Sequence, residues 1–199
     1  HKRNTNEFLS FLLTSSGIQT NPIVSPIGSM YGNAGIGTIK PSHNGTRLVA
    51  SQGHGNDPIV EVFNFNSTSG DINNMKDLNP ILNTGDSFYG IEFSPNDSLL
   101  YLSASNPDLL VQLNLLTNEI TELNSAIFDG YGALQLAPDG KIYFSITNGS
   151  QHMDVINQPN KQGFACDYEE NGIELISGTM CALGLPNLAP YSLFSDTLA

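Results

Sequence analysis

The chain has 199 residues, only 13% of them charged, and a formal net charge of −12. This acidic balance argues against a nucleic-acid partner, because affinity for phosphates depends on basic residues, and it equally disfavours docking on anionic lipid. No apolar run approaches the roughly 20 residues that span a bilayer, so we expect no membrane insertion and a single domain over residues 1–199.

One element appears near the start of the chain and returns along it. Residues 8–18 consist of an apolar segment, a polar turn and a short apolar continuation; residues 60–72 and 109–120 repeat this order, and residues 153–163 do so more loosely. Residues 60–65 alternate between two unlike faces, as expected of a strand. We therefore interpret each copy as a hairpin of two strands.

A second element lies between the copies of the first. It is a Gly-led apolar segment, a tight turn rich in Pro, Asn, Asp and Gly, and another apolar segment, at residues 37–50, 90–102 and 132–144. With Gly45, Asp97 and Gly140 taken as equivalent, the spacing is roughly 40–50 residues, which for short strands is the signature of β-propeller blades.

The predicted fold is an all-β propeller of four-stranded antiparallel blades. With strands named a to d from the axis outward, the Gly-led element is the a–b hairpin and the other element is the c–d hairpin. The blade pieces are then expected at about residues 7–25, 36–82, 89–124, 131–176 and 179–195, with an a-like strand at 179–185. No helical stripe is found. We expect about four blades, and favour part of a larger propeller over a ring closed by its terminal pieces, which would hide exposed edges.

The two cysteines, Cys166 and Cys181, fit neither a zinc knuckle nor a Cys-x-x-Cys redox motif. One interpretation is a disulfide between neighbouring strands, which contributes roughly 3 kcal/mol in the chain-entropy model if the compartment is oxidising. The alternative is two buried thiols that act as small hydrophobic groups. We expect the disulfide.

Four segments together resemble a known class of propellers. They are KPSHNGTRLVA at 40–50, YGIEFSPNDSLLY at 89–101, LQLAPDGKIY at 134–143 and GLPNL at 184–188. They are similar to the secreted β-propellers (YVTN/WD-like repeats) of large surface proteins in gliding-type Bacteroidota, which are often exported by the type IX route. The resemblance implies a secreted or cell-surface location and more blades than this chain holds, and it leaves the ligand undefined.

The candidate ligand-binding residues lie on loops. In a propeller the b–c and d–a loops share one face, and there the sequence offers oxygen and nitrogen donors with almost no basic residue. This suits a hydroxyl-rich ligand or Ca²⁺, although ordinary surface loops are the alternative. Tyr89 and Tyr131 precede inner strands and would crowd near the channel mouth, where Tyr is a frequent sugar or peptide contact; inter-blade packing is the alternative. The candidates are His54, Asn56, Asp57, Tyr89, Asn106, Asp108, Tyr131 and Asn148. His43, in an a–b turn, is interpreted as a solvated residue.

The sequence holds no Gly-x-Ser-x-Gly elbow, no His-Glu-x-x-His and no phosphate-binding loop. We therefore expect a non-enzymatic binding or adhesion module with a glycan or protein ligand on the loop face. One alternative is a propeller hydrolase or lactonase with an axial Ca²⁺ that polarises the substrate. Glu92, Asp86 and Asp129 could hold that ion, but Lys40 and Gln135 occupy matching inner-strand positions and would break a ring of carboxylates.

Another alternative is a structural spacer within a large adhesin. The apolar residues 8–13 also predict self-association or a non-native closure on the C-terminal strand of the chain, because an exposed apolar strand recruits partners.

Overall fold

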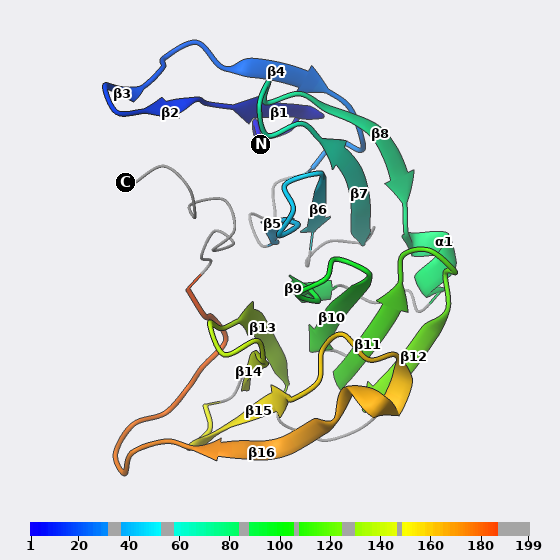
Figure 1. Ribbon diagram of the computed structural model, residues 1–199, viewed down its shortest axis with the longest axis vertical. Coiled ribbons are helices and arrows are strands. Elements are labelled where there is room, and N and C mark those ends of the chain that lie inside the picture. The colour runs from blue at the N-terminus through cyan, green and yellow to red at the C-terminus, as the bar shows by residue number, and fades with distance from the viewer. Residues whose placement is uncertain are drawn as a thin grey trace.

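Three four-stranded antiparallel sheets fan out around a common axis in the computed structural model (Figure 1). The structure describes residues 1–31, 37–52, 58–83, 88–105, 108–124, 130–146 and 149–186. Within each sheet the strands follow one another in chain order from the axis outward (Figure 1). This is the blade arrangement of a β-propeller, as the repeats predicted.

The three blades follow one another in chain order. Blade 1 comprises β5 (Ile39–Pro41), β6 (Arg47–Gln52), β7 (Ile59–Phe65) and β8 (Ile72–Asp77). Blade 2 comprises β9 (Phe88–Phe93), β10 (Leu99–Ser105), β11 (Asp108–Asn114) and β12 (Ile120–Asn124). Blade 3 comprises β13 (Tyr131–Leu136), β14 (Ile142–Ile146), β15 (His152–Ile156) and β16 (Tyr168–Glu174).

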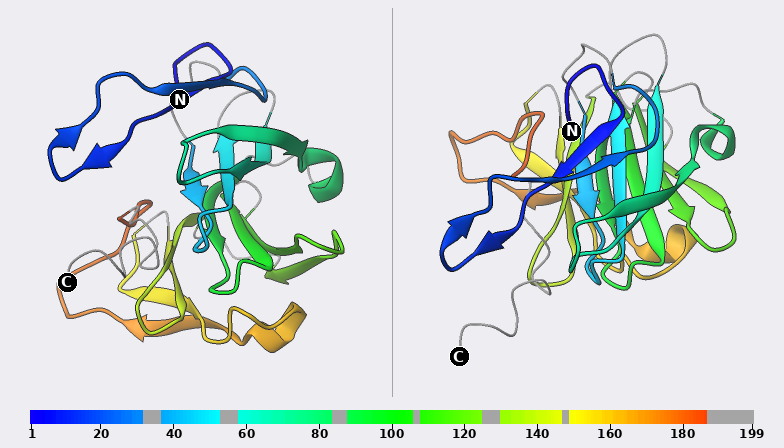
Figure 2. Two further views of the ribbon diagram at one scale, coloured as in Figure 1. Left: turned by 45° about the horizontal axis from the view of Figure 1, so that its top comes forward. Right: turned by 90° about the horizontal axis from the view of Figure 1, so that it is seen from above.

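A hairpin precedes blade 1. Its base is β1 (Glu7–Ser10) paired with β4 (Ile23–Pro26), and its tip is β2 (Leu13–Thr14) paired with β3 (Gly17–Ile18). The tip projects away from the blades in both views of Figure 2. No helix was expected, yet the connections also form α1 (Asn79–Leu82) and the 3₁₀ turn η1 (Gly163–Cys166). Both are single turns, too short to show a helical stripe.

The three a–b turns share one backbone conformation. Gly45, Asp97 and Gly140 all have positive φ, at 68°, 58° and 81°. The N–H of each one donates to the carbonyl oxygen three residues earlier, at 2.8–3.0 Å. Such a conformation favours Gly, with Asn and Asp as the usual substitutes, so the equivalence read from the sequence is confirmed.

The hydrophobic core lies at the interfaces between neighbouring blades. On β10, Leu100 and Leu102 belong to the cluster shared with blade 1, whereas Leu99 and Tyr101 belong to the cluster shared with blade 3. Each such side chain stabilises the fold by roughly 1.5–3 kcal/mol when it is fully buried. Because both faces of blade 2 are covered, its strands are apolar on both faces.

The two ends of the described chain lie against different blades. Phe8 of β1 packs on blade 1, and the Ser25 hydroxyl accepts the Ile72 N–H at 3.0 Å. At the other end Cys181 forms an isolated bridge with Ser150. The strand expected at 179–185 is therefore not formed, because this single bridge does not extend into a ladder of paired residues. Among the described residues, pairing between 7–25 and 179–186 is not present either.

The expected disulfide is also corrected. Cys166 and Cys181 are free thiols. The Cys166 carbonyl accepts the N–H of Gln158, whereas Cys181 is paired with Ser150. Strand residues advance by about 3.3 Å each, so these two anchor points lie on the order of 25 Å apart along the β15 segment. A disulfide requires Cα atoms within about 7 Å.

Candidate functional site

A pocket opens on the propeller axis where the inner strands begin. Its volume is about 140 Å³, and we call it the axial pocket. It is lined by residues of β5, β9 and β13 or next to them, and by the segment that follows blade 3. These residues are Gly37, Thr38, Lys40, Tyr89, Gly90, Ile91, Ala133, Leu134, Leu185 and Pro186.

At this end a serine on the second strand of blade 2 and of blade 3 contacts the inner segment that comes next along the chain. The Ser103 hydroxyl donates to the Gly132 carbonyl at 2.6 Å, and the Ser145 hydroxyl donates to the Leu183 carbonyl at 3.0 Å. A Cβ on Gly132 would overlap that Leu183 carbonyl oxygen, and a Cβ on Gly90 would overlap the Gly132 oxygen. The glycines that lead the a–b elements of blades 2 and 3 are therefore required by the close approach of the next inner segment, whereas a Cβ on Gly37 would overlap the Ser51 carbonyl oxygen of its own blade.

A buried polar network lies beside the pocket and joins all three inner strands. The Lys40 ammonium is 2.9 Å from Glu92 Oε2 and donates to Gln135 Oε1 at 3.1 Å. The Glu92 carboxylate also accepts the N–H groups of Leu136 and Phe93, at 2.9 and 3.0 Å. The Lys40 and Glu92 side chains are 3% and 2% exposed. The network therefore neutralises the one acidic inner-strand side chain from within the protein.

This donor set does not fit an axial Ca²⁺. Calcium prefers six to eight oxygen ligands, whereas Glu92 already pairs with the ammonium of Lys40. In the part of the chain that the structure describes, no group of three or more His, Cys, Asp and Glu side chains could hold a metal ion. The other proposed carboxylates, Asp86 and Asp129, lie outside the described residues.

Of the predicted ligand-binding residues, Tyr89 lines the axial pocket. Asp108 and Tyr131 begin β11 and β13, and the structure describes their backbone only. The remaining candidates lie outside the described residues; they are His54, Asn56, Asp57, Asn106 and Asn148.

His43 is not the solvated turn residue that the sequence suggested. The Asp97 carboxylate accepts the His43 N–H at 2.8 Å and lies 2.9 Å from His43 Nδ1, and it accepts the Asn44 N–H at 2.9 Å. Burial opposes ionisation of Asp97, but the hydrogen bonds from His43 and Asn44 outweigh it and lower the pKa of Asp97. These contacts join the a–b turns of blades 1 and 2.

Sequence reasoning also missed a buried contact at Glu61. Its side chain, on β7, accepts hydrogen bonds from the Ser29 hydroxyl at 2.7 Å and from the Tyr31 hydroxyl at 2.8 Å. Burial, followed by the nearby Glu61 charge, raises the pKa of Tyr31. The glutamate thus anchors the segment after β4 on blade 1. In the sequence, the only indication that Glu61 is buried was its position between Val60 and Val62.

Comparison with solved structures finds β-propeller proteins. Virginiamycin B lyase from Staphylococcus aureus matches 88% of this chain and 57% of its own, with a TM-score of 0.52 and 13% identity. An auxiliary nutrient binding protein from Bacteroides thetaiotaomicron matches 63% of this chain and 29% of its own, with a TM-score of 0.47 and 20% identity. This chain therefore spans less than two thirds of either structure.

At these identities the likeness to the lyase shows the propeller fold and no activity. No protein-family model matches the chain, and the search of the curated proteins finds no match. None of the helices in the described ranges is long and apolar enough to cross a membrane.

Proposed function

We propose that the chain is a non-enzymatic binding module of a secreted or cell-surface bacterial protein, and that it binds a glycan or protein ligand at the axial pocket. The observation that carries the proposal is an open pocket at Tyr89 that lies beside a buried polar network. In this network Lys40 neutralises the charge of Glu92. The extracytoplasmic location rests on the family resemblance of the four sequence segments.

The pocket chemistry suits recognition of a polar group on a larger ligand. Its volume of about 140 Å³ is close to the roughly 150 Å³ of a cavity that binds benzene, so it takes one ring or side chain rather than a whole ligand. Tyr89 supplies a flat apolar ring with a hydroxyl, which is suited to contacts that are apolar on one side and wet on the other.

The same geometry weighs against an axial hydrolase. Such an enzyme would need a cation to polarise the substrate, whereas Glu92 is held by Lys40 and by two backbone N–H groups. Among the described residues that line the axial pocket there is no carboxylate, which favours the binding module over the lactonase alternative.

Binding to glycan and peptide arrays, followed by titration of the selected ligands, tests the proposal. We expect Tyr89→Ala to weaken binding about tenfold or more, as loss of an aromatic anchor does at binding hot spots. Tyr143→Ala is the matched control, because the Tyr143 hydroxyl bonds Asp139 in the a–b turn of blade 3.

Two results would contradict the proposal. Silence across broad arrays with a well-folded protein would favour the structural spacer. Turnover of a lactone or ester that depends on Ca²⁺ would favour the enzyme. Variants of His54 and Asp57 extend the same titration to the loop candidates.

A further inference from the structure

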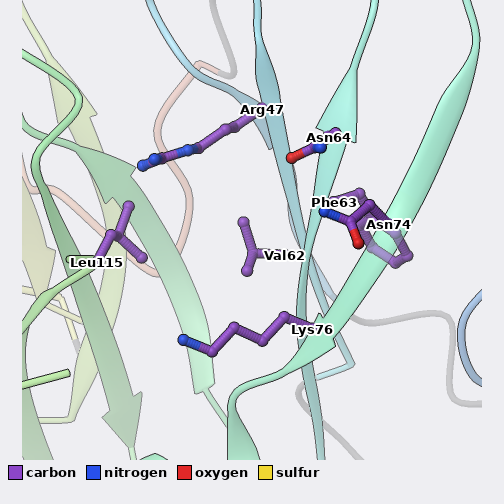
Figure 3. A pocket seen from close by; sticks show the side chains of 7 residues that line it. All are labelled: Arg47, Val62, Phe63, Asn64, Asn74, Lys76 and Leu115. Atoms are coloured by element: carbon purple, nitrogen blue, oxygen red, sulfur yellow. The ribbon is translucent and has the colours of Figure 1, made fainter. Parts of the chain in front are cut away.

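A second hollow lies away from the axis, between the outer parts of blades 1 and 2. Its volume is about 150 Å³, and we call it the inter-blade groove. It is lined by Arg47, Val62, Phe63, Asn64, Asn74, Lys76 and Leu115 (Figure 3). Further along the same two strands, β6 and β7, this face of blade 1 is buried against blade 2 through Val49 and Val60.

Strand register explains why these side chains meet. Arg47 lies opposite Asn64 on β7, and Val62 lies opposite Lys76 on β8. Directly opposed residues in an antiparallel pair share one face, as do alternate residues of one strand. The register shifts between Val62 and Asn64, and Asn74 has a positive φ of 54° in the facing part of β8. Such bulges re-aim side chains, and Asn74 lines the groove.

The groove concentrates positive charge in an acidic protein. The whole chain has 7 Lys and Arg residues against 19 Asp and Glu residues, yet two of the 7 line this one hollow. Figure 3 shows Arg47 and Lys76 extending on either side of Val62 toward Leu115. No acidic side chain is among the lining residues.

In the part of the chain that the structure describes, both cations donate across the groove to neutral oxygen atoms only. The Arg47 guanidinium donates to the Asp97 carbonyl at 3.4 Å, and the Lys76 ammonium donates to the Asn118 amide oxygen at 2.7 Å. The Asp97 carboxylate is occupied by His43 and Asn44. Within the described ranges, neither cation forms a salt bridge to a carboxylate. An anion bound in the groove would supply the negative charge for both cations.

We propose that the inter-blade groove binds an anionic sugar, through a carboxylate or a sulfate ester held between Arg47 and Lys76. Guanidinium groups bind such planar or multi-oxygen anions through several N–H donors. Asn64 and Asn74 offer amide donors and acceptors for ring hydroxyls. Val62 and Leu115 supply an apolar surface for the carbon–hydrogen face of the ring. The site is separate from the axial pocket and does not depend on ligand binding there.

Titration calorimetry with three tetrasaccharides tests this site. The probes are an oligogalacturonate, a sulfated galactan fragment and a neutral galactan fragment, all at low ionic strength. We expect the charged probes to bind and the neutral one not to bind at the same concentrations. Affinity should fall as salt is added, because exposed charges are screened. The stronger charged probe distinguishes a carboxylate from a sulfate ligand.

Variants locate the binding in the groove. Arg47→Gln and Lys76→Gln should each weaken binding of the charged probe about tenfold or more, since hydrogen bonds to charged groups are the strong ones. Lys141→Gln is the matched control: it removes one charge from blade 3, where Lys141 also meets an asparagine oxygen, at 2.7 Å. Tyr89→Ala should leave this binding unchanged, which separates the site from the axial pocket. Circular dichroism melting of each variant verifies that it is folded.

Several outcomes would overturn the site. One is equal binding of the neutral and charged probes. Another is charged-probe binding that Arg47→Gln and Lys76→Gln leave intact, or that Lys141→Gln weakens equally. Failure of both charged probes to bind folded protein overturns it as well. Binding of an acidic peptide at the groove with no binding of either sugar would overturn the ligand class.

Discussion

At the scale of single residues, the most consequential side chain is Lys40. It lies on the inner strand of blade 1, only 3% exposed, and it pairs with Glu92 of blade 2 and Gln135 of blade 3. Taking a charge out of water is costly unless a partner compensates it. The network therefore fixes the three inner strands relative to one another and removes Glu92 from any role as a free metal ligand.

Lys40→Met is expected to destabilise the fold by about 3–5 kcal/mol, because it leaves the Glu92 charge buried without its partner. The double variant Lys40→Met/Glu92→Gln should recover much of that loss, since it removes the stranded charge and keeps an oxygen for the Leu136 N–H. Urea unfolding measures both. A single variant within about 1 kcal/mol of the parent would show that the pair contributes as little as an exposed salt bridge.

Asp97 makes stability depend on pH. Its pKa lies below the ordinary value of 3.8 in the folded chain, so the unfolded state binds the proton more readily. The contribution is present above pH 3.8 and is lost as the pH falls through the folded-state pKa. Asp97→Asn should cost about 1.5–3 kcal/mol at pH 6 and clearly less at pH 3. An equal loss at both values would contradict the assignment.

At the scale of elements, the sequence predicted what is locally determined. The a–b turns were aligned correctly because positive φ at Gly45, Asp97 and Gly140 restricts the residue type at each turn. The contact of His43 with Asp97 spans 54 residues and exists only once two blades pack, so no local pattern could indicate it. A local pattern could not indicate the inter-blade groove either, because the register of three strands brings its lining residues together.

The cysteines illustrate this limit, because their spacing along the chain did not reveal that they contact opposite ends of the segment that contains β15. Burial is the main cause that raises the pKa of the Cys166 thiol. Less of the thiolate, which is the reactive form, is therefore present. We expect iodoacetamide to spare Cys166 in the native protein and to modify both cysteines in denaturant without reductant. Unreactive cysteines under those denaturing conditions, with a mass lower by two hydrogen atoms, would indicate the disulfide.

At the scale of the whole molecule, three inter-blade and hairpin clusters hold the sheets together, and the hairpin tip carries apolar side chains that these clusters do not cover. Leu13 and Ile18 are 69% and 66% exposed. The fold class and the blade order were predictable from repeats, whereas the axial pocket was anticipated only at Tyr89. Most of its remaining lining residues are glycines and apolar side chains, whose types alone do not indicate a binding site.

The exposed tip predicts self-association, since apolar surface of this kind recruits a partner. Sedimentation velocity at micromolar concentration should detect a species larger than the monomer. The double variant Leu13→Lys/Ile18→Lys should shift it to monomer. Leu116→Lys, which alters a side chain 89% exposed on blade 2, is the control and should leave association unchanged. A monomer at every concentration would refute the prediction.

The location of ligand binding tests the account most directly. The measurement is an NMR titration of the chain with the sugar or peptide selected on the arrays, with the shifted amide signals mapped on the structure. We predict that the shifts centre on Thr38, Tyr89, Gly90 and Ala133, around the axial pocket. Shifts that avoid all four residues would contradict the assignment of the axial pocket as the binding site.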